Sequence, residues 1–160
     1  MITTIVFDFS RTLLFYNDES YSGSLNKMHK KLSEDENYQF FDHYSFNKQL
    51  VDFISQYKDK YQLYIFTSGN LHEMPGIKEI VDEVFIRVIK SHEFDLEKTD
   101  PHAYQVLSST ILEVPAEEIL FIDDQIERIN AAKESGVNTI HFQTNEQTIS
   151  ELKTVLNLEE

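Results

Sequence analysis

The chain has 160 residues, of which 41% are hydrophobic and 12% aromatic, and its formal net charge is −14. This apolar content excludes a disordered chain and suits one domain with a single core over residues 1–160. The negative charge argues against nucleic acids and anionic membrane surfaces as partners, because it repels phosphate groups. The absence of cysteine excludes disulfides and thiolate metal sites.

The first apolar run, residues 2–7, reads as a strand and lacks the basic flank and length of a signal peptide. No apolar stretch reaches the roughly 20 residues that a membrane helix needs. We therefore expect a cytoplasmic protein without a membrane partner.

Five short apolar runs predict buried strands. Each run is almost continuously hydrophobic, which is typical of a parallel sheet that is covered on both faces. The runs cover residues 4–7, 62–66, 84–89, 119–122 and 138–142.

Segments with helical spacing separate these runs. Pro101, after Asp100, and Pro115 are typical of helix starts, and Gly136 of a helix end. Strand and helix alternate, which predicts an α/β fold: a Rossmann-like three-layer sandwich with a mostly parallel sheet of about five strands. The expected helices are those at 77–82, 125–136 and 147–156 and two apolar stripes, Phe46, Leu50, Phe53, Ile54 and Tyr57, then Tyr104, Leu107, Ile111 and Leu112.

The stretch from about residue 13 to residue 44 interrupts the alternation. It is rich in Tyr, Asn, Asp, Ser and Lys, and it follows the first strand. About 30 residues cannot build an independent core. We therefore expect a short flap or cap on the single domain, with one or two helical turns near residues 25–32.

Polar residues follow the predicted strands, where ligands bind in open α/β sheets. A carboxylate at Asp8 is suited to attack phosphorus and form an aspartyl-phosphate. Lys98 is suited to neutralise the charge on Asp8 and on the transferred group. The pair Asp123 and Asp124 offers the oxygen ligands that Mg²⁺ prefers.

A second polar group, Thr67-Ser68-Gly69-Asn70, follows the predicted strand at 62–66. The Thr67 hydroxyl and the backbone amides of a glycine-containing turn are suited to bind phosphoryl oxygens. We therefore predict that Thr67, Ser68, Gly69 and Asn70 bind phosphate, together with Lys98.

In their order along the chain, these motifs resemble those of the haloacid dehalogenase-like hydrolase superfamily. The four motifs are the strand that ends at Asp8, the strand that ends at Thr67, the residue Lys98, and the sequence Phe121-Ile122-Asp123-Asp124. The resemblance covers nearly all of the chain outside the insert. It is best over residues 93–142.

The resemblance implies a role for each matching residue. Asp8 is the expected nucleophile and an Mg²⁺ ligand, with the backbone carbonyl of Ser10 as a further ligand. Asp124 is the more direct ligand of the acidic pair, and Asp123 assists. The implied catalytic residues are Asp8, Ser10, Thr67 and Lys98, and the implied cofactor is Mg²⁺.

Two positions depart from the phosphatases of this superfamily. These usually have a second aspartate two residues after the nucleophile, which protonates the leaving group and then activates water, and here that residue is Ser10. Loss of such a group typically costs about 10²–10⁴ in rate. With serine at this position, we expect slow turnover, a substrate with a good leaving group, or another group that carries the proton. Arg11 lies where glycine is common, and it either binds an anionic substrate or pairs with a carboxylate.

The resemblance thus implies an Mg²⁺-dependent phosphatase or phosphotransferase that acts on a phosphate monoester. One alternative is a related protein that binds phosphate and Mg²⁺ with weak or no turnover. A haloacid dehalogenase ranks third, because it has an aspartate nucleophile but needs no Mg²⁺ pair. The expected partner is a small phosphorylated substrate or an exposed phosphate on a larger molecule. The sequence leaves the oligomeric state open.

Overall fold

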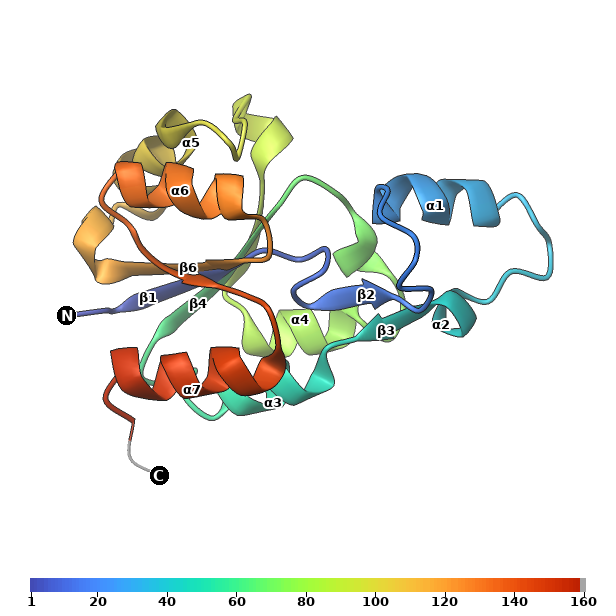
Figure 1. Cartoon of the computed structure of the whole chain (residues 1–160), viewed down its shortest axis with the longest axis horizontal. Helices are drawn as coiled ribbons and strands as arrows, with labels where there is room; N and C mark the ends of the chain where they lie inside the picture. Colours follow the sequence, from blue (N-terminus) through green and yellow to red (C-terminus); the bar gives the residue numbers. More distant parts are fainter. Residues whose placement is uncertain (159–160) are drawn as a thin grey trace.

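The structure, a computed structural model, describes residues 1–158. Five parallel strands form one sheet in the order β5-β4-β1-β6-β7, with the first strand of the chain at its centre (Figure 1). These strands are β1 (Thr4–Phe7), β4 (Gln62–Thr67), β5 (Arg87–Lys90), β6 (Ile119–Asp123) and β7 (Asn138–His141).

Helices cover both faces of the sheet, so the predicted three-layer α/β fold is confirmed (Figure 1). Successive side chains of β1 point to opposite faces: Ile5 and Phe7 belong to one hydrophobic cluster, and Val6 to the other. The first cluster packs under α3 (Lys48–Ser55), α4 (Lys78–Val84) and α7 (Asn145–Val155). The second packs under α5 (Pro101–Val106) and α6 (Ile126–Glu134).

The helix ends follow local sequence chemistry. Asp100 caps α5 by accepting a hydrogen bond from the amide of His102, and Pro101 occupies the first turn. Gly136 follows α6 with φ of 87°, a conformation that glycine adopts without strain. Within residues 1–158, no helix has both the length and the apolar character to cross a membrane.

Some predicted boundaries were wrong. The strand expected from residue 84 begins only at Arg87, because Val84 is the last residue of α4 and the amide of Phe85 still donates a hydrogen bond to the carbonyl of Val81. Pro115 precedes only a short 3₁₀ turn, η4 (Ala116–Glu118), rather than an α-helix. The stripe that ends at Leu112 is α-helical only to Val106 and continues as a π-helix, η3 (Leu107–Leu112). The two remaining short 3₁₀ helices are η1 (Leu71–Glu73) and η2 (Ser91–Phe94).

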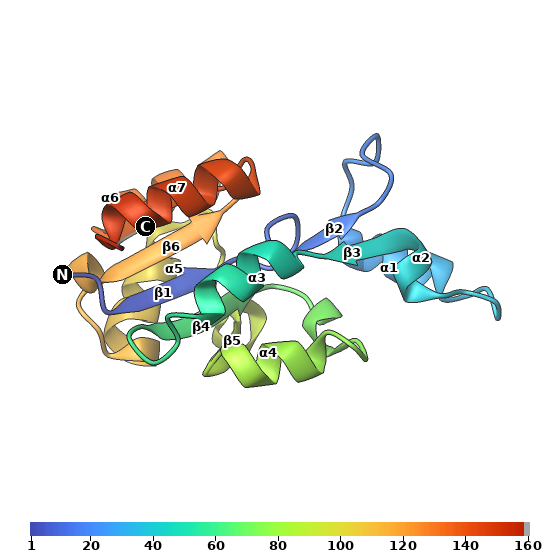
Figure 2. The ribbon, with the colours of Figure 1, turned by 90° about the horizontal axis from the view of Figure 1, so that it is seen from below.

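The insert forms a projection beside the sheet, which we call the flap (Figures 1 and 2). The chain enters it through β2 (Leu14–Tyr16) and leaves through the antiparallel β3 (Tyr44–Phe46). Between these strands lie α1 (Leu25–Leu32) and α2 (Phe40–His43). The buried Tyr44 hydroxyl donates a 2.7 Å hydrogen bond to the carbonyl of Leu25, which ties α1 to the hairpin.

Candidate active site

The carboxyl ends of β1, β4 and β6 bring the predicted site residues together. Asp8 directly follows β1, and its amide donates a 2.8 Å hydrogen bond to the carbonyl of Ile122 on β6. Thr67 is the last residue of β4, and Asp123 is the last residue of β6. The parallel register of the three strands therefore places the carboxylates and the hydroxyl at one edge of the sheet.

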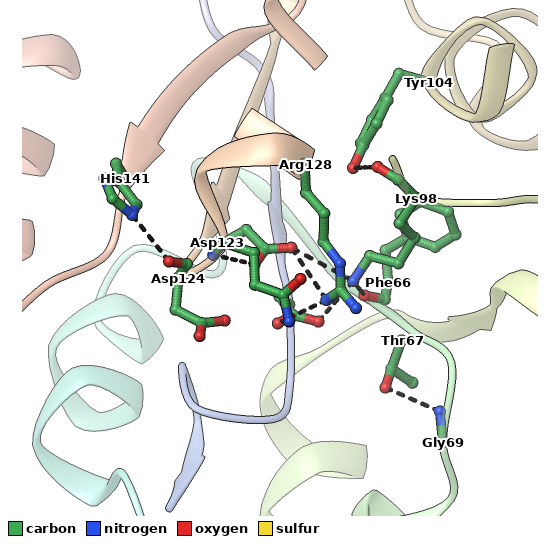
Figure 3. A network of polar contacts seen from close by, with 11 residues as sticks. Phe66, Thr67, Gly69, Lys98, Tyr104, Asp123, Asp124, Arg128 and His141 are labelled. Atoms are coloured by element: carbon green, nitrogen blue, oxygen red, sulfur yellow. Dashed lines mark hydrogen bonds and ion pairs between the residues drawn. The ribbon is translucent and has the colours of Figure 1, made fainter. Parts of the chain in front are cut away.

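A buried ion pair joins Asp8 to Lys98. The Lys98 Nζ lies 2.5 Å from Asp8 Oδ1. It donates a second hydrogen bond to the Phe66 carbonyl at 2.8 Å (Figure 3). Both charged side chains are 3% exposed. Tyr104 donates a 2.7 Å hydrogen bond to the Lys98 carbonyl, which fixes the backbone of this loop. Lys98 is therefore held against the nucleophile predicted from the sequence.

Arg128, on α6, is a second cation in the site, and the sequence analysis missed it. Its Nη1 lies 3.4 Å from Asp8 Oδ2. The same atom lies 3.5 Å from Asp123 Oδ2 (Figure 3). The feature of the sequence that could have identified Arg128 is its position in the first turn of a predicted helix, where the helix dipole disfavours a positive charge. A cation there indicates nearby carboxylates that compensate for this cost.

Burial and mutual repulsion raise the pKa values of the acidic pair, Asp123 and Asp124. Burial, followed by the charge of Asp8, raises the pKa of the Asp123 carboxyl above its ordinary value. The same causes, with a contribution from Asp123, raise the pKa of Asp124 to about 8. His141 Nε2 donates a 2.8 Å hydrogen bond to the Asp124 carbonyl and fixes its backbone. Three carboxylates face two cations here, so the cluster favours one more positive charge.

The three carboxylates fit a divalent metal ion. Asp8, Asp123 and Asp124 each offer an oxygen, and these atoms all lie within 4.8 Å of one another. Asp124 Oδ1 is buried and has no hydrogen-bond partner among the described residues. Such an unpartnered oxygen is costly unless it binds a cation. Clustered carboxylate oxygens are the ligand type of Mg²⁺.

A small pocket of about 140 Å³ opens above Asp8, and we call it the phosphoryl pocket. The residues Ser10, Thr67 and Ser68 line it, together with Arg128. The Thr67 Oγ1 accepts a 3.3 Å hydrogen bond from the Gly69 amide (Figure 3). The remaining residues of its wall are Arg11, Ser24, Leu25, Asn26 and Gln125.

Gly69 and Asn70 contact the flap rather than this pocket. The Asn70 amide donates a 3.3 Å hydrogen bond to Asn26 Oδ1 on α1. A Cβ on Gly69 would overlap the side-chain amide of Asn26. The turn that was predicted to bind phosphate therefore also supports α1, and glycine allows this close approach.

Arg11 adopts an unusual backbone conformation with φ of 61°, in the left-handed region that favours glycine. Its guanidinium donates hydrogen bonds to the carbonyls of Gly23, at 2.5 Å, and Tyr21, at 3.3 Å. Arg11 therefore joins the flap to the turn that follows Asp8, a contact that neither sequence interpretation included. Substrate binding by Arg11, which also lines the phosphoryl pocket, stays a prediction.

Solved structures share this fold. A predicted HAD-like hydrolase from Porphyromonas gingivalis is 19% identical, with a TM-score of 0.67 and full coverage of both chains. A HAD family enzyme from Bacteroides thetaiotaomicron, in complex with magnesium and inorganic phosphate, is 15% identical, with a TM-score of 0.63 over 89% of this chain and 95% of that one. A dehalogenase with an intermediate complex is 15% identical, with a TM-score of 0.69 and 96% of each chain covered.

These likenesses confirm the haloacid dehalogenase-like fold that the motifs indicated. No curated protein matches the sequence. The family comparison is more specific, because the match to the NLI interacting factor-like phosphatases extends over residues 3–160. The chain therefore belongs to the NLI interacting factor-like phosphatase family.

Proposed function

We propose that this protein is an Mg²⁺-dependent phosphatase that hydrolyses a phosphate monoester through an aspartyl-phosphate on Asp8. The observation that carries the proposal is the buried contact of Asp8 with Lys98, beside the acidic pair Asp123 and Asp124. Membership of a phosphatase family supports the reaction class. The magnesium and phosphate in the Bacteroides thetaiotaomicron enzyme support the cofactor.

In this proposal, different side chains attack phosphorus, stabilise its charge and position its oxygens. An Asp8 oxygen attacks phosphorus, and the leaving group departs with the electron pair of the broken P–O bond. Lys98 and Arg128 stabilise the negative charge that the phosphoryl oxygens bring to the buried site. The Thr67 hydroxyl and Ser68, which both line the phosphoryl pocket, position those oxygens.

Asp8, Asp124 and the carbonyl of Ser10 would hold the Mg²⁺ ion, with Asp123 assisting. The bound ion supplies positive charge that keeps these carboxylates ionised and lowers repulsion toward the dianionic ester. The unpartnered Asp124 Oδ1 supports this assignment, since the ion would satisfy it.

The second half of the reaction transfers the phosphoryl group from Asp8 to water. Ser10 lines the phosphoryl pocket, and it stands two residues after Asp8, where the resemblance leads us to expect a second aspartate that activates water. A hydroxyl is a poor base at neutral pH, so we expect slow release of phosphate.

Two other functions make different predictions. A protein that binds phosphate and Mg²⁺ without turnover would keep the same carboxylates, and its distinguishing feature would be the absence of hydrolysis. A haloacid dehalogenase would not need the acidic pair, and the three clustered carboxylates therefore favour the phosphatase. The likeness to a dehalogenase structure concerns the fold alone.

The test is hydrolysis of p-nitrophenyl phosphate by the wild type and by Asp8→Asn, with Asp59→Asn as an exposed control. We expect Mg²⁺-dependent release of phosphate in the wild type and the control, and none in Asp8→Asn. Turnover equal to the Asp8→Asn background across a broad panel of esters would favour the binding protein. A crystal soaked with fluoroberyllate should show beryllium on Asp8, and its absence there would contradict the site itself.

A further inference from the structure

A second hollow, larger than the phosphoryl pocket, lies between the flap and the end of β7. It has a volume of about 480 Å³, and we call it the aromatic hollow. Phe15 and Phe142 stack on each other with ring centroids 6.0 Å apart, and Tyr16 meets Tyr21 edge to face at 5.3 Å. All four rings line the hollow, together with Arg11, Asn17, Asp18, Glu19, Ser45, Asp124 and Gln143.

Two residues connect this hollow to the reacting atoms. Asp124 forms part of its wall, and an Asp124 oxygen lies within 4.8 Å of an Asp8 oxygen. Arg11 lines both the aromatic hollow and the phosphoryl pocket. A group bonded to a phosphoryl unit above Asp8 therefore has an adjoining space with aromatic walls. Such walls favour a flat ring.

Ser10, in the turn that follows Asp8, also favours an aromatic leaving group. Ser10 is a poor proton donor at neutral pH, so without another proton carrier the leaving group departs as an anion. A phenol loses its proton near pKa 10, whereas an alkyl alcohol is far less acidic. An aromatic ring on the bridging oxygen therefore satisfies both the missing acid and the shape of the hollow.

We propose that aryl phosphate monoesters are the substrate class of this site, with the ring bound in the aromatic hollow. The proposal rests on the function proposed above. Asp8 attacks phosphorus, the bond from phosphorus to the aryl oxygen breaks, and its electron pair leaves on the phenolate, which takes a proton from water. A water molecule then replaces Asp8 on phosphorus, so that one ester and one water yield one phenol and one inorganic phosphate.

The ring should be neutral or positively charged. Asp18 and Glu19 are exposed residues of the hollow's wall, and Asp124 adds a third carboxylate there. Arg11 is the single cation among the lining residues, and its guanidinium already binds two backbone carbonyls. A carboxylate on the ring would meet this negative wall, so 4-carboxyphenyl phosphate should bind less tightly than phenyl phosphate.

The first experiment compares phenyl phosphate with acetyl phosphate, which has a good leaving group but no ring. Phe15→Leu and Tyr16→Leu should raise KM for phenyl phosphate about 3–10-fold and leave KM for acetyl phosphate unchanged. The matched control is Phe53→Leu, on α3 and outside both pockets, which should change neither value. Thermal unfolding shows that each variant is folded. Equal KM values for phenyl phosphate in all variants would overturn the ring site.

The second experiment tests the leaving group with phenyl phosphate and cyclohexyl phosphate. The wild type should prefer phenyl phosphate by about 10²-fold or more, the size of a missing general acid. Ser10→Asp should raise the rate with cyclohexyl phosphate more than the rate with phenyl phosphate, so the preference narrows. Equal use of the two esters by the wild type would overturn the proposal.

Binding separates failure of this inference from failure of the proposed function. Phenylphosphonate, which is not hydrolysed, should bind more tightly than methylphosphonate in the presence of Mg²⁺, and Phe15→Leu should remove the difference. Ring-dependent binding without any hydrolysis would contradict the phosphatase function and support the ring site. Hydrolysis without ring dependence would support the phosphatase function and contradict the ring site. The KM values for free O-phosphotyrosine and for a phosphotyrosyl peptide are then compared. The substrate with the lower KM shows whether the site prefers a small aryl phosphate or an aryl phosphate on a protein.

Discussion

The two walls of the candidate site are held by different forces. The core wall consists of buried charges at strand ends, where Asp8 and Lys98 are each 3% exposed. The flap wall is attached through contacts to neutral partners: Arg11 donates to backbone carbonyls, and Asn26 accepts from the amide of Asn70. Charge on the rigid sheet suits the phosphoryl chemistry, and the flap suits selection of the leaving group. Substitutions should therefore act differently on the two walls.

The largest effect is expected for Lys98→Met. Among residues 1–158, it leaves the buried Asp8 with only the more distant Arg128 as a cation, and breaking a buried pair typically costs about 3–5 kcal/mol. The control is Lys78→Met, which breaks the exposed pair with Asp82 and should cost under about 1 kcal/mol. Urea unfolding followed by circular dichroism measures both. Equal losses would show that the core wall is not held by charge.

Arg128→Gln is the next test of the core wall. Arg128 lies 3.4 Å from Asp8, so its removal should lower kcat by about 10–100-fold through lost stabilisation of phosphoryl charge. Arg128→Lys keeps the charge but not the planar fork, and it should recover part of the rate. Arg87→Gln on β5 is the exposed control. An unchanged kcat in Arg128→Gln would limit Arg128 to a structural role.

The acidic pair predicts an unusual pH dependence of the metal-free protein. The pKa of Asp124 is raised from 3.8 to about 8, so between these values the folded protein holds a proton that the unfolded chain has lost. The free energy of unfolding should therefore fall as pH rises from about 4 to 8. The melting temperature of the wild type in EDTA should decrease over this range, and that of Asp124→Asn should decrease less.

Magnesium supplies the control for this prediction. If Asp124 holds the ion, Mg²⁺ binds the ionised carboxylate and displaces the proton, so added Mg²⁺ should raise the melting temperature more at pH 8 than at pH 5. Asp123, whose pKa is also raised, should keep part of the effect in Asp124→Asn. Identical pH profiles for the wild type and the variant would contradict the assignment of Asp124.

The sequence predicted the core wall better than the flap wall. Asp8, Thr67 and Asp123 could be placed together because each comes at the end of an apolar run, and parallel strands end at one edge. Lys98 lies in the loop after β5, and its position near the end of a predicted strand already assigned it to neutralise the charge on Asp8; the family motif agreed with that assignment. Arg128 was missed because one of its two partners, Asp8, lies far away in sequence. Only its unfavourable place in a helix turn pointed to carboxylates nearby.

The flap could not be read in the same way. The helix at Leu25–Leu32 was expected, but its attachment through Asn26 depends on the absent side chain of Gly69, which no sequence period reveals. The aromatic hollow joins Phe15 from β2 to Phe142 beyond β7, and their stacking depends on how the flap sits on the sheet. Long-range packing of an insert carries no local signature.

The smallest effect on stability, and the sharpest test of the flap wall, is expected for Arg11. Arg11→Gly relieves the left-handed backbone, worth about 1–2 kcal/mol, but removes the hydrogen bonds to Tyr21 and Gly23. These changes oppose each other, so the melting temperature should shift by only a few degrees. Hydrogen exchange of the amides at residues 21–27 should nevertheless become faster, while exchange in β1 and β6 stays slow.

Arg11→Lys separates the two contributions. Lysine keeps the Cβ and therefore the backbone strain, but it lacks the fork that reaches both carbonyls. It should loosen residues 21–27 as Arg11→Gly does, and it should be less stable than Arg11→Gly by about 1–2 kcal/mol. If exchange in the flap stayed at the wild-type rate in both variants, the guanidinium would not be what fastens it. The flap would then be held by the Asn26 contact and by the aromatic packing around Tyr44.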